Sequence, residues 1–69
     1  MLKEYIEELG LNPKHTFKQI DLKNSGKRGM DIDLITYEEF DENFQFVRRF
    51  TIQDTMSIYP PHNRHISFA

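Results

Sequence analysis

Apolar and polar side chains alternate along the middle of the chain, on both sides of a polar tripeptide at residues 41–43. Successive side chains of a β-strand point to opposite faces of a sheet, so this two-residue period predicts strands. The tripeptide Asp41-Glu42-Asn43 then predicts the turn of a β-hairpin. The apolar face of that hairpin is expected to consist of Met30, Ile32, Leu34 and Phe40 before the turn, and Phe44, Phe46, Phe50 and Ile52 after it.

A helix is the alternative for residues 37–50, because a stripe of apolar side chains there also follows a period of roughly 3.5 residues. Phe46, Phe50 and Ile52 fall outside that stripe. The segment is also rich in aromatic and β-branched residues, which favour strands. We therefore predict strands on both sides of the turn.

The start of the chain predicts a short amphipathic helix. Gly10 suits the residue that follows a helix, Leu11 can fold back onto it, and Pro13 prevents its continuation. One face of this helix would carry the apolar side chains Leu2, Tyr5, Ile6 and Leu9. A helix of two turns is not stable alone, so its apolar stripe must dock on another element.

Other segments predict further strands. Residues 16–22 form the first, with a loop at 24–29 after it, and residues 55–59 and 65–68 form a C-terminal hairpin around the break at 60–63. The chain is thus expected to be a single domain, residues 1–69, of the α+β class. It would have a short N-terminal helix and a small antiparallel sheet of about four to five strands, which could close partly into a barrel.

Size and composition limit what such a domain can do. A domain of 69 residues buries only about 60% of the surface of its unfolded chain, and the absence of cysteine excludes stabilising disulfides. Six phenylalanines are difficult to cover in one small monomer, so we expect a dimer or larger assembly. The chain has neither a secretory leader nor an apolar run of roughly 18 residues, and we expect a soluble, cytoplasmic protein with no membrane partner.

Charge is segregated along the chain although the net charge is only −2. Residues 14–28 carry five basic residues against Asp21, a balance of +4, and residues 29–42 carry six acidic residues and no basic one, a balance of −6. The basic residues are Lys14, Lys18, Lys23, Lys27 and Arg28, and the acidic ones are Asp31, Asp33, Glu38, Glu39, Asp41 and Glu42. Such fields can steer a charged partner, or they can reflect simple pairing across adjacent strands.

Candidate chemical sites are few. His62 and His65 have the spacing of a metal-binding pair that His15 could join, but zinc requires three or four ligands, and two histidines beside a proline turn are usually solvated. Asp31 and Asp33 would point to the same side of one strand, as magnesium ligands must, yet we expect that side to be the solvent-facing one. We predict no metal, no cofactor and no enzymatic activity.

The order of elements resembles the Sm-like fold of the Hfq-type RNA-binding proteins. Residues 41–44, Asp-Glu-Asn-Phe, lie where these proteins carry an acidic residue and an asparagine before an apolar strand, and residues 63–66, Asn-Arg-His-Ile, lie near their last-strand motif. The glycine of their second strand has no counterpart between Met30 and Phe40. The resemblance implies a small barrel that binds RNA, but a shared architecture says little about function.

Three functional hypotheses follow. The first is a protein-binding module, such as an inhibitor or regulator of the kind encoded by phages and mobile elements, which docks through the six acidic residues of 29–42 or through a strand edge. The second is nucleic-acid binding through the five basic residues of 14–28 together with Arg48 and Arg49, although the overall acidity argues against it. The third is a structural protein that self-associates through exposed strands.

Arg48 and Arg49 lie on opposite faces of their predicted strand, which places Arg48 on the apolar face. We expect Arg48 to reach the rim of that face or to pair with Glu38 across the hairpin. An arginine flanked by phenylalanines is also typical of an interface hot spot.

Overall fold

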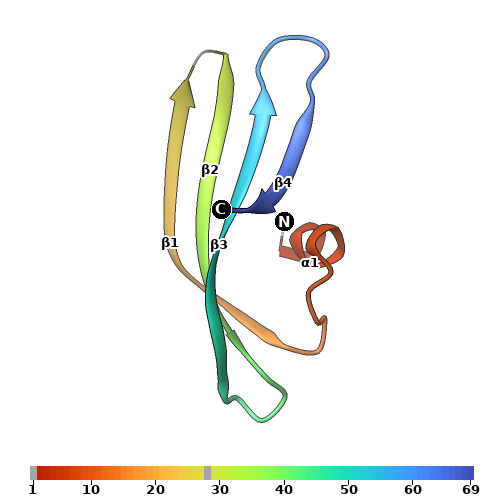
Figure 1. Ribbon diagram of the computed structural model, residues 1–69, viewed down its shortest axis with the longest axis vertical. Coiled ribbons are helices and arrows are strands. Elements are labelled where there is room, and N and C mark those ends of the chain that lie inside the picture. The colour runs from red at the N-terminus through yellow and green to blue at the C-terminus, as the bar shows by residue number, and fades with distance from the viewer. Residues whose placement is uncertain (1, 28) are drawn as a thin grey trace.

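The computed structural model describes residues 2–27 and 29–69, and this part of the chain forms one helix and four strands (Figure 1). The strands form one antiparallel sheet in the order β1-β2-β3-β4, so each strand pairs with its neighbour in the sequence. The α+β class is therefore confirmed. The elements are α1 (Leu2–Leu9), β1 (Thr16–Lys27), β2 (Met30–Phe40), β3 (Phe46–Ser57) and β4 (Arg64–Phe68).

Within residues 2–27 and 29–69 the sheet has four strands and is open, so the predicted fifth strand and partial barrel are not found there. β3 runs without interruption through Gln53 and Asp54, where we had separated two strands. No glycine or proline stops the chain there, and both residues pair with β2. β1 likewise extends to Lys27, through most of the segment predicted to be a loop, because that segment pairs with the start of β2.

Local signals at the end of α1 are confirmed. Gly10 adopts a positive φ of 65°, and the backbone amide of Leu11 donates a 2.9 Å hydrogen bond to the carbonyl of Ile6. This arrangement satisfies one of the carbonyls that a helix leaves unpaired at its C-terminus. The side chain of Leu11 is buried, as expected for the apolar contact that follows such a cap.

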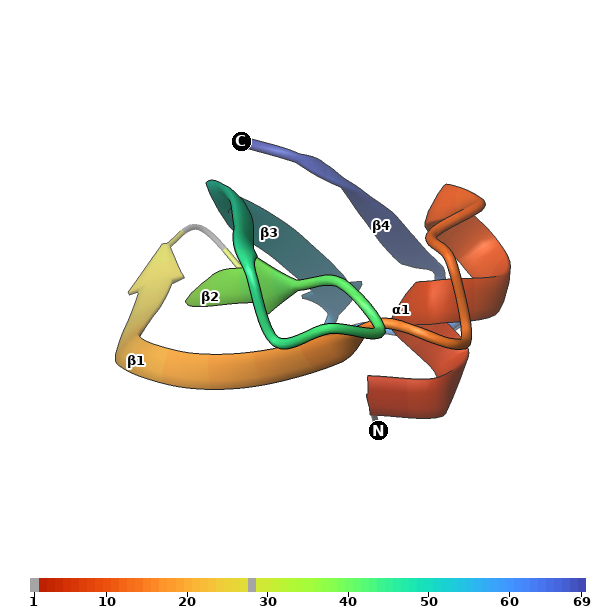
Figure 2. The same cartoon turned by 90° about the horizontal axis from the view of Figure 1, so that it is seen from below.

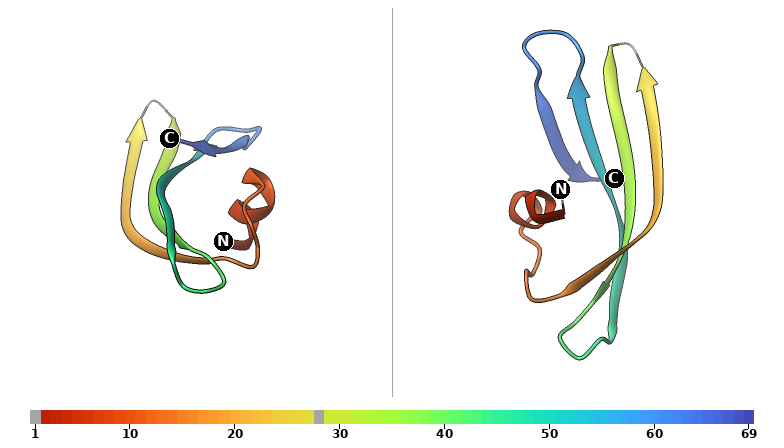
Figure 3. Two further views of the ribbon diagram at one scale, coloured as in Figure 1. Left: turned by 60° about the horizontal axis from the view of Figure 1, so that its bottom comes forward. Right: turned by 180° about the vertical axis from the view of Figure 1, so that it is seen from behind.

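α1 lies against one face of the curved sheet (Figures 2 and 3). We call this the helix-side face. The core forms where the apolar stripe of the helix meets the middle of β2 and β3. Ile35 pairs with Ile52 and Tyr37 with Phe50, so these side chains share the face that the helix covers. Tyr5 from the helix completes this core.

The face that α1 covers is not the one that we predicted for β2. Met30, Ile32 and Leu34 have the opposite parity to Ile35 and Tyr37, so they lie on the face that the helix leaves uncovered. We call this the open face. Met30 is exposed there, while Ile32 and Leu34 are half-buried. Since Leu34 and Ile35 are adjacent and both apolar, the alternation could not indicate which parity would receive the helix.

The molecule is elongated, with principal extents of 44 × 20 × 15 Å. Its radius of gyration is 13.3 Å, whereas a compact chain of this length has roughly 11 Å. Its accessible surface of 5059 Å² likewise exceeds the roughly 4,600 Å² expected for a monomer of its mass. Many large apolar side chains among the described residues are exposed: Ile20, Leu22, Met30, Phe44, Phe46, Val47, Met56, Ile58, Tyr59 and Phe68.

Candidate protein-binding site

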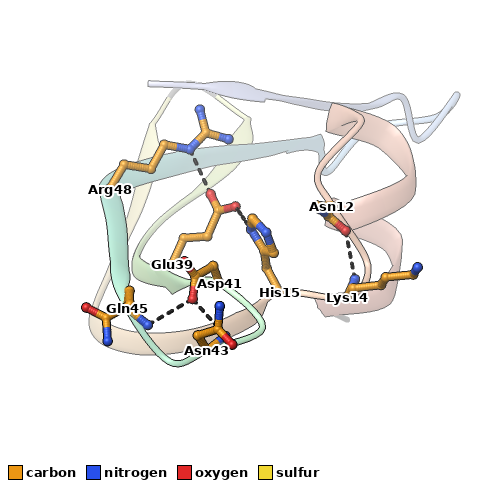
Figure 4. Close-up of polar contacts among 8 residues, drawn as sticks. All are labelled: Asn12, Lys14, His15, Glu39, Asp41, Asn43, Gln45 and Arg48. Carbon is orange, nitrogen blue, oxygen red and sulfur yellow. Dashed lines mark hydrogen bonds and ion pairs between the residues drawn. The ribbon is translucent and has the colours of Figure 1, made fainter.

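The turn between β2 and β3 is held by one aspartate. The backbone amide of Asp41 donates to the carbonyl of Gln45 (2.9 Å), and the carbonyl of Asp41 accepts from the amide of Phe44 (3.0 Å). Its carboxylate Oδ1 accepts from the amides of Asn43 (2.8 Å) and Gln45 (3.0 Å) (Figure 4). Short polar side chains favour turns because they bond to nearby backbone amides in this way. The predicted turn at 41–43 is thus confirmed, and its backbone is well fixed.

Phe44 follows this turn in an unusual conformation. Its φ is +61°, in the left-handed region that disfavours residues with a Cβ, and 76% of its surface is exposed. Phe46 is also exposed, and its ring makes an edge-to-face contact with Phe40 at a centroid distance of 6.0 Å. We call Phe40, Phe44 and Phe46 the aromatic tip. It lies at the end of the β2–β3 hairpin, far from the β3–β4 loop (Figure 1).

The exposure of Phe44 and Phe46 corrects our prediction that both belong to the apolar face of the hairpin. β3 begins only at Phe46, so Phe44 is part of the turn. The register also shifts beside the turn, since Glu39 pairs with Arg48 while Phe40 pairs with Phe46. Val47 is the extra residue, and such a bulge changes the parity of the strand before it.

A buried carboxylate lies next to the aromatic tip. Glu39 is only 4% exposed, and its two oxygens accept hydrogen bonds from Arg48 Nε (2.8 Å) and His15 Nδ1 (2.6 Å) (Figure 4). Burial raises the pKa of Glu39, but the hydrogen bonds and charges of Arg48 and His15 outweigh it and leave this pKa below its ordinary value. This contact ties the segment between α1 and β1 to β2 and β3.

Arg48 contacts two aromatic rings besides Glu39. Its guanidinium carbon lies 5.1 Å from the centroid of Phe50 and 5.6 Å from that of Phe68. We expected Arg48 either to reach the rim of its face or to pair with Glu38. The pairing is wrong, because Glu38 pairs with Arg49 at 3.1 Å, whereas the half-exposed side chain of Arg48 agrees with a position at the rim. The two arginines do lie on opposite faces of β3, as predicted.

The six acidic candidates do not gather on one surface. Asp31 and Asp33 bond to Asn24 of β1 on the helix-side face, whereas Glu38 is on the open face. The remaining three are divided between an ion pair and the turn: Glu39 is buried against Arg48, Asp41 holds the turn, and Glu42 is exposed within it.

The basic candidates are also dispersed. Lys14 lies before β1, Lys18 is opposite Glu38, and Lys23 is opposite Leu34. Arg48 and Arg49 are engaged with Glu39 and Glu38. The side chain of Lys27 and all of Arg28 lie outside the described part of the structure.

The histidines do not form a metal site. His62 hydrogen-bonds through Nδ1 to the carbonyl of Ser57 (3.1 Å), His65 lies on β4 opposite Thr55, and His15 is bound to Glu39. Within residues 2–27 and 29–69, no three or more potential ligands are grouped so as to hold a metal ion.

Sequence analysis missed a second polar network, which fastens α1 to the sheet. Asp54 is buried and accepts hydrogen bonds from Tyr5 Oη (2.8 Å) and from Arg64 Nε (3.0 Å) and Nη2 (2.8 Å). These bonds from Arg64 hold the pKa of Asp54 below its ordinary value, and burial raises the pKa of Tyr5 to about 12. Arg64 also binds Glu4 of α1. The partners are far apart in the sequence, so no spacing indicated them.

Shallow depressions flank this network. One of about 260 Å³ is lined by Glu4, Glu7, Glu8, Arg64 and Ile66. Another of about 270 Å³ is lined by Glu4, Asp31, Asp33, Asp54, Met56 and Arg64. Arg64 and Glu4 border both, and they already neutralise each other there, so we regard these depressions as part of the helix attachment.

Among the described residues, no helix has the length and apolar character needed to cross a membrane. Comparisons with models of protein families, with curated proteins and with solved structures give no match to this chain.

Proposed function

We propose that this chain is a non-enzymatic protein-binding module that inserts its aromatic tip into an apolar cavity of a larger protein. The observation that carries this proposal is Phe44, a residue that is 76% exposed although its backbone is held at a φ of +61°. Exposure of the ring and the left-handed backbone are both unfavourable in the free chain. A partner that buries the ring would offset both costs, as an aromatic anchor in an interface does.

The surroundings of Phe44 support an anchoring role. Four hydrogen bonds made by Asp41 fix the backbone of the turn, so little backbone conformational entropy remains to be lost when the ring is bound. The hydrogen bonds of Glu39 with Arg48 and His15 brace the same hairpin next to the aromatic tip. A short chain with a rigid, protruding aromatic anchor suits an inhibitor or regulator that occupies a site on its target. We do not propose the six acidic residues as a recognition surface, because they do not share one; Glu39 and Asp41 act only by supporting the hairpin.

The proposal is tested with variants that separate the ring from the backbone strain. The tagged wild-type chain is used to capture partners from its source cells, with F44G, F44A and F44Y in parallel. Both F44G and F44A remove the ring, whereas F44Y retains an aromatic side chain. We expect F44G and F44A to lose the captured partner by at least tenfold and F44Y to retain it, since anchor residues contribute about 2 kcal/mol or more.

A matched control removes another exposed apolar side chain at the far end of the molecule. Ile58 lies in the β3–β4 loop and is 55% exposed, so I58S changes apolar surface without touching the aromatic tip. Retention by I58S together with loss by F44G supports the proposal. Retention of the partner by F44G, or equal loss by I58S, would show that the tip is not the binding site.

A further inference from the structure

β1 is a long edge strand. It pairs with β2 along its whole length, and its other edge faces away from the remaining elements (Figure 1). An unpaired edge presents backbone donors and acceptors that can pair with another strand. Leu22, near the middle of β1, is 55% exposed although it lies on the same face as the core residue Ile35. The edge therefore combines unpaired backbone groups with an uncovered apolar side chain.

We infer that a second copy of this chain pairs with this edge, β1 against β1 in antiparallel orientation, with a two-fold axis through Leu22. Such an interface is isologous, so each contact between two different residues occurs twice. The two four-stranded sheets would form one continuous sheet. This interface is independent of the aromatic tip.

The charges of β1 select this register. Asp21 lies opposite Thr36 and Lys23 opposite Leu34, so both side chains are on the open face, and neither forms an ion pair within the described part of the chain. A two-fold axis at Asp21 would place the two copies of Asp21 opposite each other, and an axis at Lys23 would place the two copies of Lys23 opposite each other. Like charges directly opposite are destabilising. An axis at Leu22 instead places Asp21 opposite Lys23 of the second copy, twice, and opposite charges in such pairs are stabilising.

The same register places the two copies of Leu22 opposite each other on the helix-side face. Their Cβ atoms would then be about 4.5–5.5 Å apart, within reach of direct contact. Ile20 is the extra residue of the β-bulge between Gln19 and Asp21, and it lies outside these three central pairs. The pairing would thus use a regular part of β1 and cover one of the exposed apolar side chains.

The test exchanges the two charges. D21K alone or K23D alone converts two attractive pairs into two repulsive ones, and each should raise the dimer dissociation constant about tenfold. The double variant D21K/K23D restores opposite charges at both pairs and should return this constant to near the wild-type value. Sedimentation equilibrium at low salt measures the constants, because screening weakens exposed pairs, and circular dichroism checks that each variant is folded.

K18D is the matched control, since it makes the same charge change as K23D at a position of β1 that this register leaves opposite the uncharged Ser25. We expect K18D to dimerise like the wild-type chain. A monomeric wild-type chain at the highest soluble concentration would overturn the inference. So would a dimer that the single variants do not weaken, that the double variant does not restore, or that K18D weakens as much as K23D.

Discussion

Phe44 occupies a backbone conformation that glycine adopts more easily than any residue with a side chain. The left-handed region costs a residue with a Cβ roughly 1–2 kcal/mol, and glycine's greater freedom in the unfolded chain costs roughly 0.5–1 kcal/mol. Because the ring is largely exposed, its removal gives up little burial. We therefore expect F44G to raise the free energy of unfolding by about 0.5–1 kcal/mol, measured by urea titration.

F44A provides the comparison, because it removes the ring but keeps the Cβ in the left-handed conformation. We expect F44A to be no more stable than the wild-type chain. If F44G and F44A have the same stability, the backbone strain at this position is negligible. The binding role proposed for Phe44 would then rest on the exposure of its ring alone. A gain of stability in F44G with loss of partner binding would be the pattern of a residue kept for function.

Glu39 and Asp54 make stability depend on pH. Both carboxyl groups have a pKa below its ordinary value in the folded chain, as their hydrogen bonds to Arg48, His15 and Arg64 stabilise the charged form. The unfolded chain thus takes up protons first as the pH falls below about 4. Their contribution to stability is complete above that range and is lost as the pH falls through the folded-state values.

We expect the urea midpoint to be level near neutral pH and to fall below about pH 4. E39Q keeps an acceptor for Arg48 but cannot titrate, so it should be about 1–3 kcal/mol less stable near pH 7 and should lose less stability in acid. Parallel curves for the wild-type chain and E39Q throughout the acid range would contradict this role for Glu39.

Local features were predictable at the residue scale, and distant partners were not. Gly10 and Leu11 cap α1 as expected, because the cap depends on residues adjacent in the chain. Asp41 holds its turn for the same reason. The partners of Glu39 and Asp54 lie on separate elements, and only the docking of α1 and the strand register bring them together. Neither the positive φ of Phe44 nor the bulge at Val47 has a signature in the apolar pattern.

At the scale of elements, α1 depends on the sheet for its stability. Eight residues are too few for a helix to persist in water, and its last turn carries no basic residue to complement the dipole. Tyr5 supplies the attachment, since its ring is fully buried in the core and its hydroxyl donates to Asp54. Undocking this one side chain should therefore unfold the helix.

Two variants distinguish the contribution of the Tyr5 hydroxyl to stability from that of its ring. Y5F removes only the hydroxyl and leaves Asp54 with Arg64, so we expect a loss of about 1 kcal/mol. Y5A also removes the ring and should cost about 3–5 kcal/mol, together with the helical signal in far-ultraviolet circular dichroism. A helical signal that persists in Y5A would show that other contacts of the stripe suffice to hold α1.

The sequence predicted the positions of the helix and the hairpins more accurately than it predicted which of their faces are buried. The helix, the central hairpin and the C-terminal hairpin were predicted because caps, turns and periodicity are encoded locally. The covered face of β2 was predicted wrongly, since both parities of that strand are apolar around Leu34 and Ile35. The choice between them is made by α1, which packs on Ile35 and Tyr37. Among the candidate site residues, Asp41 belongs to the hairpin now proposed to bind, but it acts there by holding the turn.

At the scale of the whole molecule, the chain buries too little for its size. The buried apolar residues of the described chain are only Tyr5, Leu11, Ile35, Tyr37 and Ile52, while the molecule is elongated and the open face of its sheet is uncovered. A small domain with so limited a core has a thin margin of stability unless another copy or a partner adds to it. Any association that involves only the folded chain must add to stability by mass action.

Dimer formation through β1 should therefore make the thermal midpoint depend on concentration. If β1 pairs with β1 of a second copy, the thermal midpoint of the wild-type chain should rise by roughly 2–5 °C for each tenfold increase in concentration within the dimerising range. D21K should show a lower midpoint and a weaker dependence, because its dimer forms only at higher concentration, and D21K/K23D should recover both. Calorimetry on the three chains over a concentration series measures the effect. A midpoint independent of concentration in all three would mean that the folded monomer is stable alone, and that the exposed apolar surface, including the aromatic tip, is reserved for a different partner.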